Sequence, residues 1–119
     1  MARILIVDDS TFTRNIHRQI VAAEGHETLE AGGGTDAVEI FDRERPDLVL
    51  IDLLMPDMDG IDAVRKMLEI DPDARILVCS TDRQRPRQEE AREAGVLEFL
   101  TKPVDPGKMA ESLDRILKD

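Results

Sequence analysis

A run of four aliphatic residues that ends at an aspartate constrains the fold of this chain more than any other feature. Leu48–Ile51 is apolar at every position, which is typical of a strand buried on both faces of a parallel sheet. Asp52 follows directly, and Met55-Pro56 prevents further pairing because proline has no N–H. Asp59-Gly60 then provides a turn. The pattern therefore places the Asp52 carboxylate at the C-terminal edge of a buried strand, where open parallel sheets bind ligands.

The rest of the chain alternates between strand patterns and helix patterns. Four further segments are predicted as strands: 4–7, 27–31, 76–79 and 96–100. The segments between the strands and after the last one are predicted as helices: one capped by Ser10 or Thr11 and stopped by Gly25, one that ends before Pro46, one over about 60–69, one over about 86–94 and a last one that includes Met109 and Leu117. Five strands alternating with five helices indicate an α/β fold, with a parallel sheet covered on both faces. We expect residues 1–119 to form one domain.

The spacing of apolar residues predicts which helical side chains enter the core. These stripes are Phe12, Ile16, Ile20 and Ala23 in the first helix, Ala37, Val38 and Phe41 in the second, Ile61, Val64 and Leu68 in the third, and Met109, Leu113, Ile116 and Leu117 in the last. The segment 83–94 differs, because its apolar side chains are limited to Ala91 and Ala94. We therefore expect the fourth helix to be the most mobile element. We expect His17 and His26 to lie on the surface.

Charge and composition exclude several classes of function. The chain has 16 Lys and Arg residues against 26 Asp and Glu residues, a net charge of −10. Nucleic-acid binding through phosphates needs a basic face, so we expect no direct nucleic-acid partner. No apolar run approaches the roughly 20 residues of a membrane span, and no signal peptide is evident. Cys79, the single cysteine, excludes an internal disulfide and fits a reducing cytosol. We therefore predict a soluble, cytoplasmic protein with no membrane partner.

Polar residues follow four of the five predicted strands. They are Asp8, Asp9, Asp52, Ser80 and Lys102. The C-terminal ends of parallel strands meet at one edge of a sheet, so these side chains can converge. Three crowded carboxylates repel one another, and at least one pKa should rise unless a cation joins them. An all-oxygen cluster suits Mg²⁺, and a hydroxyl and an ammonium are donors for an oxyanion. Together these groups are the parts needed for phosphoryl transfer to an aspartate.

Each member of this set has a simpler explanation when it is taken alone. Asp8 and Asp9 can form a solvated turn, Ser80 can be a strand-end hydroxyl, and Lys102 can be a surface lysine. Their joint placement after four strands makes a chance arrangement improbable. The run Gly32 to Gly34 is not a Walker phosphate loop, because no Gly-Lys-Ser/Thr follows it.

From end to end, the chain resembles the receiver domains of response regulators in two-component signalling. The matching residues are Val7-Asp8-Asp9, Asp52 with Met55-Pro56 and Met58-Asp59-Gly60, Ser80, Phe99 and Lys102-Pro103. The spacings from Asp52 to Ser80 and from Ser80 to Lys102 are typical of this family. The resemblance implies a flavodoxin-like (βα)5 three-layer sandwich, with a five-stranded parallel sheet of order 2-1-3-4-5. Among receivers, the chain is most similar to stand-alone chemotaxis regulators.

The resemblance implies a signalling switch that depends on a metal ion. Asp52 takes a phosphoryl group from the phosphohistidine of a sensor histidine kinase or a histidine phosphotransfer protein. Mg²⁺ is ligated by Asp9, by Asp52 and by the backbone carbonyl of Leu54, while Asp8 acts through water; Mn²⁺ can replace it. The only catalysis is the protein's own phosphorylation and dephosphorylation, so we do not expect an enzyme that turns over a separate substrate. We expect a monomer.

The resemblance also implies how the signal leaves the site. Ser80 and Lys102 contact the phosphoryl oxygens, and the turn that aims Lys102 has a cis bond before Pro103. Phe99 turns inward when Ser80 moves towards the phosphoryl group. This change alters the binding of a downstream protein target on the face formed by the fourth helix, the fifth strand and the fifth helix.

Four positions depart from the family pattern or control access to the acceptor. Thr81 replaces the usual alanine or glycine and crowds the entry path of the phosphate. Leu54 is apolar where many relatives have a polar side chain near the attacking water, so we expect slow dephosphorylation. Asp82 stands with them at the access side of the site. Phe99 lacks the hydroxyl of relatives that have tyrosine there.

An alternative class is an enzyme or flavin binder with the same fold. An aspartate-based, Mg²⁺-dependent phosphohydrolase has two aspartates separated by one residue after the first strand, whereas Asp8 and Asp9 are adjacent. A flavin phosphate loop has Ser, Thr or Gly there, and two carboxylates repel a phosphate. A receiver that serves only for docking is disfavoured, because no site residue is missing.

Overall fold

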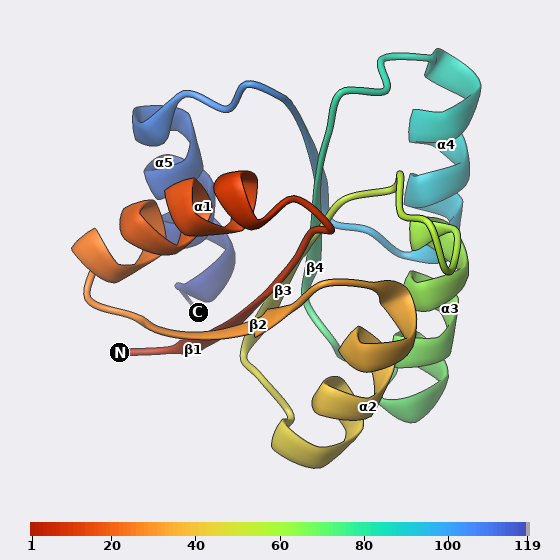
Figure 1. The fold of residues 1–119 in the computed structure, drawn as a ribbon, viewed down its shortest axis with the longest axis horizontal. Coiled ribbons are helices and arrows are strands. Elements are labelled where there is room, and N and C mark those ends of the chain that lie inside the picture. Colours follow the sequence, from red (N-terminus) through yellow and green to blue (C-terminus); the bar gives the residue numbers. More distant parts are fainter. Residues whose placement is uncertain (119) are drawn as a thin grey trace.

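The computed structural model describes residues 1–118, in which strands and helices alternate along the chain (Figure 1). The elements are β1 (Arg3–Val7), α1 (Thr11–Ala23), β2 (Glu27–Ala31), α2 (Gly34–Glu44), β3 (Leu48–Ile51), α3 (Gly60–Ile70), β4 (Ile76–Ser80), α4 (Arg85–Ala94), β5 (Glu98–Thr101) and α5 (Pro106–Leu117). All strand pairs are parallel, in the order β2-β1-β3-β4-β5. The predicted α/β class and strand order are confirmed.

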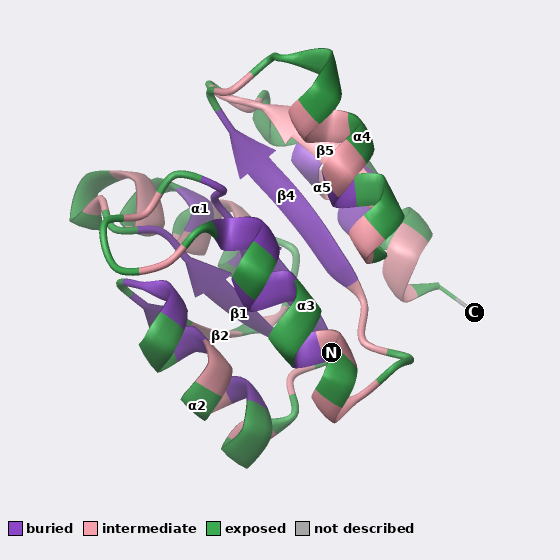
Figure 2. Ribbon diagram, turned by 90° about the vertical axis from the view of Figure 1, so that its right-hand side faces the viewer, coloured by how far each residue is buried: buried purple, intermediate pink, exposed green. Residues whose placement is uncertain are grey.

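Helices cover both faces of the sheet, so the fold has three layers. In Figure 1, α1 and α5 lie on one side of the sheet and α2, α3 and α4 on the other. Successive strand residues point to opposite faces, so Leu5 and Val7 pack with α2 and α3, whereas Ile4 and Ile6 pack against α1 and α5. Figure 2 shows β4 buried along its whole length. The aliphatic runs of β1, β3 and β4 therefore form the centre of two cores.

The strand register determines which residues leave the sheet together. Val7 on β1 pairs with Ile51 on β3, so Asp8 and Asp52 leave the sheet as neighbours. The backbone N–H of Asp52 donates to the Val7 carbonyl at 3.0 Å, which extends the ladder by one residue. Ser80, the last residue of β4, pairs with Thr101 on β5, directly before Lys102.

The predicted inner face of α1 is wrong for three of its four residues: Ile20 packs against the core, whereas Phe12, Ile16 and Ala23 are exposed. Phe12 and Ile16 are 76% and 41% exposed, whereas the buried residues of the helix are His17 and Val21. Adjacent helical positions differ by about 100°, so the buried face lies one position beyond the predicted stripe. The helix begins where the Ser10 hydroxyl accepts from the Thr13 N–H at 3.2 Å, and the short connection from β1 sets which face meets the sheet. The pattern of hydrophobic residues alone does not show which face of α1 meets the sheet.

The structure buries one of the two histidines that were expected on the surface. His17 is only 5% exposed, so its predicted place on the surface is wrong. Burial lowers the pKa of His17, and the nearby charge of Lys102 lowers it further, against the opposing effect of Asp8 and Asp52. His26 is half-buried and accepts a hydrogen bond at Nδ1 from the Ala2 N–H, at 3.0 Å.

The last third of the chain follows the predicted order, with small shifts of several boundaries. β5 begins at Glu98 rather than at Val96. Gly95 ends α4 in the left-handed region with φ 115°, and Val96 and Leu97 belong to the connection that follows. A side chain at Gly95 would also meet Leu68 Cδ1 at 2.6 Å. Over residues 1–118, none of the helices has the length and apolar character needed to cross a membrane.

Candidate functional site

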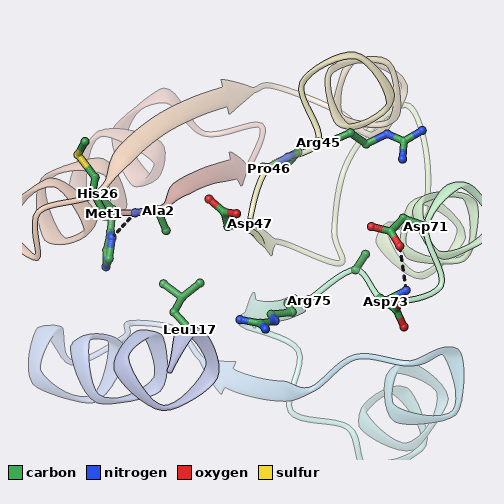
Figure 3. A pocket seen from close by; sticks show the side chains of 11 residues that line it. Met1, Ala2, His26, Arg45, Pro46, Asp47, Asp71, Asp73, Arg75 and Leu117 are labelled. Carbon is green, nitrogen blue, oxygen red and sulfur yellow. Dashed lines mark hydrogen bonds between the residues drawn. The ribbon is translucent and has the colours of Figure 1, made fainter. Parts of the chain in front are cut away.

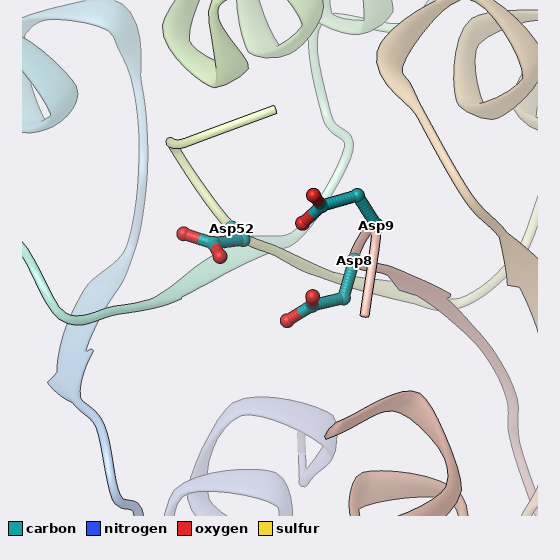
Figure 4. Close-up of side chains that lie close together, drawn as sticks. All are labelled: Asp8, Asp9 and Asp52. Carbon is teal, nitrogen blue, oxygen red and sulfur yellow. The ribbon is translucent and has the colours of Figure 1, made fainter. Parts of the chain in front are cut away.

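Three carboxylates meet at the C-terminal edge of the sheet (Figure 4). Asp8 and Asp9 follow β1 and Asp52 follows β3, and each offers an oxygen within 4.8 Å of the others. Asp8 and Asp52 are buried, whereas Asp9 is exposed. Hard divalent cations such as Mg²⁺ prefer oxygen ligands of this kind and keep several waters. An edge with two buried carboxylates and one exposed carboxylate fits such an ion.

The ammonium of Lys102 lies between two of these carboxylates. Its Nζ is 2.5 Å from Asp8 Oδ2 and 2.9 Å from Asp52 Oδ2. Partial burial disfavours the charged form of Lys102, but the hydrogen bonds and negative charges of Asp8 and Asp52 outweigh it and raise its pKa. Lys102 is thus a cation that joins the cluster, as the crowding of carboxylates required. The Lys102–Pro103 bond is cis, the geometry that the resemblance implied.

Ser80 lies beside Lys102 at the end of β4. It is fully buried, and its carbonyl accepts from the Lys102 N–H at 2.8 Å. Its hydroxyl accepts from the Asp82 N–H at 3.2 Å. Thr81 between them is exposed, and Asp82 is half-buried with Oδ1 accepting from the Gln84 N–H at 3.0 Å. The Ser80 hydroxyl therefore belongs both to the sheet edge and to the connection that leads into α4.

The loop after Asp52 folds back under the carboxylate. Asp52 Oδ1 accepts from the Leu54 N–H at 3.1 Å, and the Leu53 carbonyl accepts from the Gly60 N–H at 3.0 Å. A Cβ at Gly60 would lie 2.5 Å from the Asp52 carbonyl oxygen, so only glycine fits where the loop closes. Asp59 caps α3 by accepting from the Ile61 N–H at 2.9 Å. Leu54 is 52% exposed, at the rim of the cluster.

Phe99 lies on β5, which β4 separates from the strands that carry the acidic cluster. It is half-buried and packs against the core on the side of α2, α3 and α4. Its sheet neighbour is Val78 on β4, two residues before Ser80.

Two contacts of the loop after Asp52 were missed by sequence reasoning. The Asp57 carboxylate accepts from the Gly34 N–H at 3.1 Å and from the Thr35 N–H at 3.0 Å. Arg87 on α4 donates to Asp59 Oδ1 at 2.9 Å. The glycine run before α2, which offers no capping side chain of its own, was the signal for the first contact. The second contact joins distant segments and left no local signal.

A hollow of about 560 Å³ lies at the opposite edge of the sheet (Figure 3). Residues before β1, β3 and β4 line it, among them Ala2, Asp47 and Arg75. Asp47 Oδ2 accepts from the Arg3 N–H at 2.8 Å, and Arg75 donates to the Ile116 carbonyl at 3.0 Å. The first contact joins the starts of β1 and β3, and the second joins the start of β4 to the end of α5. None of the predicted site residues lines this hollow.

Comparison with known proteins gives the same assignment over most of the chain. The family model of the response regulator receiver domain matches residues 4–114. The chain is 41% identical to the chemotaxis protein CheY of Thermotoga maritima, over 98% of both chains. It is 40% identical to the chemotaxis protein CheY of Bacillus subtilis, over 97% of both chains.

Solved structures agree with this assignment. A CheY-like receiver domain from Methanospirillum hungatei superposes with a TM-score of 0.94 at 27% identity, covering 98% of this chain and 94% of that chain. CheY in a CheX–CheY–BeF3–Mg complex from Borrelia burgdorferi superposes with a TM-score of 0.94 at 30% identity, covering 98% of this chain and 90% of that chain. Sequence, strand order and the acidic edge therefore agree: this chain belongs to the response regulator receiver domain family and is of the CheY type.

Proposed function

We propose that this chain, as a single domain over residues 1–119, is a Mg²⁺-dependent phosphoacceptor switch. Asp52 takes a phosphoryl group from the phosphohistidine of a sensor histidine kinase or a histidine phosphotransfer protein. The observation that carries the proposal is the placement of Asp52 between two further carboxylates and the Lys102 ammonium, at the ligand-binding edge of the sheet. The B. burgdorferi CheY, whose complex contains Mg²⁺ and BeF3, supports it by similarity.

In the transfer step, an oxygen of Asp52 forms a bond to phosphorus while the bond from phosphorus to the donor imidazole nitrogen breaks. The electron pair of the broken bond returns to that nitrogen. Lys102 has three N–H donors, and two of them donate to Asp8 and Asp52. The third is available to a phosphoryl oxygen, where its positive charge stabilises the developing negative charge.

The acidic cluster supplies the ligands for the metal ion. Asp9, Asp52 and the backbone carbonyl of Leu54 would hold it, with Asp8 acting through water. When bound, Mg²⁺ neutralises charge on the transferring oxygens. Asp9 is exposed, so it is accessible to an ion that arrives from solvent. Mn²⁺ has the same charge and accepts the same oxygen ligands, and can replace Mg²⁺ here.

Ser80 and Phe99 are the proposed switch. The Ser80 hydroxyl accepts from Asp82 in the unphosphorylated protein, and it turns towards the phosphoryl group once that group is present. Phe99, half-buried beside β4, then moves inward. The change alters the face formed by α4, β5 and α5, to which a downstream protein binds. The protein acts in the cytoplasm as a monomer, and its only catalysis is its own phosphorylation and dephosphorylation.

Intact-mass spectrometry tests the proposal directly. The chain is incubated with acetyl phosphate and Mg²⁺, and parallel samples contain EDTA or the Asp52→Asn variant. We expect the mass of one phosphoryl group to be added in the first sample and in neither control. Addition without a divalent cation, or to Asp52→Asn at the wild-type rate, would overturn the proposal.

A further inference from the structure

The loop after Asp52 is tied to the start of α2 by a carboxylate that does not belong to the acidic cluster. The two oxygens of Asp57 accept from the first two N–H groups of α2, those of Gly34 and Thr35. The N-cap residue Gly33 has no side chain, so Asp57 caps this helix from another segment. The hydrogen bonds from Thr35 and Gly34 are the main cause of a lowered pKa of Asp57, so the carboxylate stays ionised at neutral pH.

The glycine run before α2 leaves room for this contact. A Cβ at Gly33 would lie 2.8 Å from Asp57 Oδ1, and a Cβ at Gly34 would lie 2.8 Å from Met58 Cβ. Gly33 has extended backbone with φ −169°, a conformation that any residue can adopt. A small residue is favoured here because of the nearby Asp57 side chain, and not because of backbone strain. The residue types on both sides of the contact therefore fit one another.

Met55 and Met58 pack the loop after Asp52 against the core, and the Asp57 contact adds the hydrogen bonds that fix its backbone. In the part of the chain that the structure describes, the two Asp57 bonds are the recorded hydrogen bonds from residues 55–58 to another segment. This segment connects Leu54, whose carbonyl is a proposed metal ligand, with Asp59, the N-cap of α3. Mg²⁺ requires near-ideal octahedral geometry and tolerates little displacement of a ligand. Holding the loop in place removes an ordering cost from metal binding.

We propose that Asp57 is a positioning residue for the metal site: its bridge to Gly34 and Thr35 holds the Leu54 peptide where it can join Asp9 and Asp52 around Mg²⁺. The inference rests on the proposed function and adds a residue to it that touches neither the metal ion nor the phosphoryl group. The glycine run before α2 contributes to the same positioning, because it leaves room for the Asp57 carboxylate.

A charge-conserving swap separates positioning from helix capping. Asp57→Ala removes the bridge and the cap together. Asp57→Ala combined with Gly33→Asp restores a carboxylate at the N-cap of α2 but leaves the loop untied, and the missing Asp57 side chain makes room for it. Asp71→Ala is the matched control, because it removes one charge and one carboxylate bond, to the Asp73 N–H at 3.0 Å, at the other end of α3.

Isothermal titration calorimetry measures the Mg²⁺ dissociation constant of each variant, at a temperature at which circular dichroism shows it fully folded. We expect Asp57→Ala to raise the dissociation constant about five-fold, because the untied loop must then be ordered when the ion binds. We expect the swap to leave it raised, and Asp71→Ala to leave it at the wild-type value. A wild-type dissociation constant for Asp57→Ala, or its recovery in the swap, would overturn the inference. If the wild-type chain itself binds no Mg²⁺, the proposed function fails first.

Discussion

The Nζ of Lys102 lies 2.9 Å from Asp52 Oδ2, although the two residues come from different loops at the sheet edge. The same ammonium contacts Asp8, so one cation serves two buried carboxylates. This arrangement stabilises the site before any phosphoryl group or metal ion arrives. It also keeps a donor beside the proposed acceptor oxygen of Asp52. Stability and the proposed phosphorylation are therefore linked through one side chain.

Replacing Lys102 with Met should destabilise the protein when Mg²⁺ is absent. The substitution leaves Asp8 and Asp52 buried without their cation, and loss of one partner from a buried pair costs about 3 kcal/mol. Urea unfolding in EDTA measures this change. Asp52→Asn combined with Lys102→Met removes the repulsion as well and should regain part of the loss. Equal stability of Lys102→Met and the wild type would contradict this account of the pair.

Mg²⁺ should stabilise the fold. It relieves repulsion among Asp8, Asp9 and Asp52 only when they are brought together. Linkage gives about 2.7 kcal/mol when the ion is at 100 times its dissociation constant. The measurement is thermal unfolding with and without Mg²⁺ at constant ionic strength, and Asp9→Asn should lose most of the shift. An unchanged melting temperature of the wild-type chain would count against the site.

Replacing Leu54 with Asn should speed the loss of phosphate. Leu54 is 52% exposed at the rim of the cluster and cannot form a hydrogen bond with an attacking water. Asparagine can orient that water, and orientation contributes to the rate. Loss of the phosphoryl mass over time gives the rate for both proteins, with Leu54→Met as the apolar control. The idea fails if the asparagine variant holds its phosphate as long as the wild type.

The helix α4 should exchange its amide hydrogens faster than α5. Ala91 is the buried residue of α4, whereas α5 buries Met109, Ser112 and Leu113. A helix that buries little surface opens at a low free-energy difference. Hydrogen exchange should also change in α4 on phosphorylation, because the connection from Ser80 leads into it. Equal protection of the two helices, unaffected by phosphorylation, would exclude α4 as the switch surface.

Stability should rise with pH through the range just below the ordinary pKa of histidine. Burial lowers the pKa of His17 in the folded protein from its ordinary value of 6.5. Between the two values the unfolded chain binds more protons than the folded one, so raising the pH favours folding and lowering it favours unfolding. Urea unfolding from pH 5 to 7, at about one-half unit intervals, should show this slope. His17→Gln should reduce it, and the half-buried control His26→Gln should keep it.

Most of the architecture was predictable because a few local signals dominate it. The aliphatic side chains of Leu48–Ile51 point to both faces of the strand, so they are all buried only if a layer of helices covers each face of the sheet. Asp52 marks the end of the run. In parallel sheets the strand ends share one edge, so the meeting of Asp8, Asp9 and Asp52 followed from order alone. The same logic placed Lys102 beside them.

The features that were missed depend on how elements pack. The face of α1 was assigned from hydrophobicity, and the structure buries His17 while it exposes Phe12, because the cap and the short connection orient the helix. The bridge from Asp57 to Gly34 joins segments that the sequence keeps apart. Only the absence of a capping side chain at the start of α2 pointed to it.

We expect phosphorylation at Asp52 and at neither of its acidic neighbours. Borohydride reduces an aspartyl phosphate to homoserine, so it marks the modified residue permanently. The chain is treated with acetyl phosphate and Mg²⁺, reduced, digested and sequenced by tandem mass spectrometry. We expect homoserine at position 52 and unmodified aspartate at Asp8 and Asp9. Homoserine at position 8 or 9, or at none of the three, would contradict this expectation.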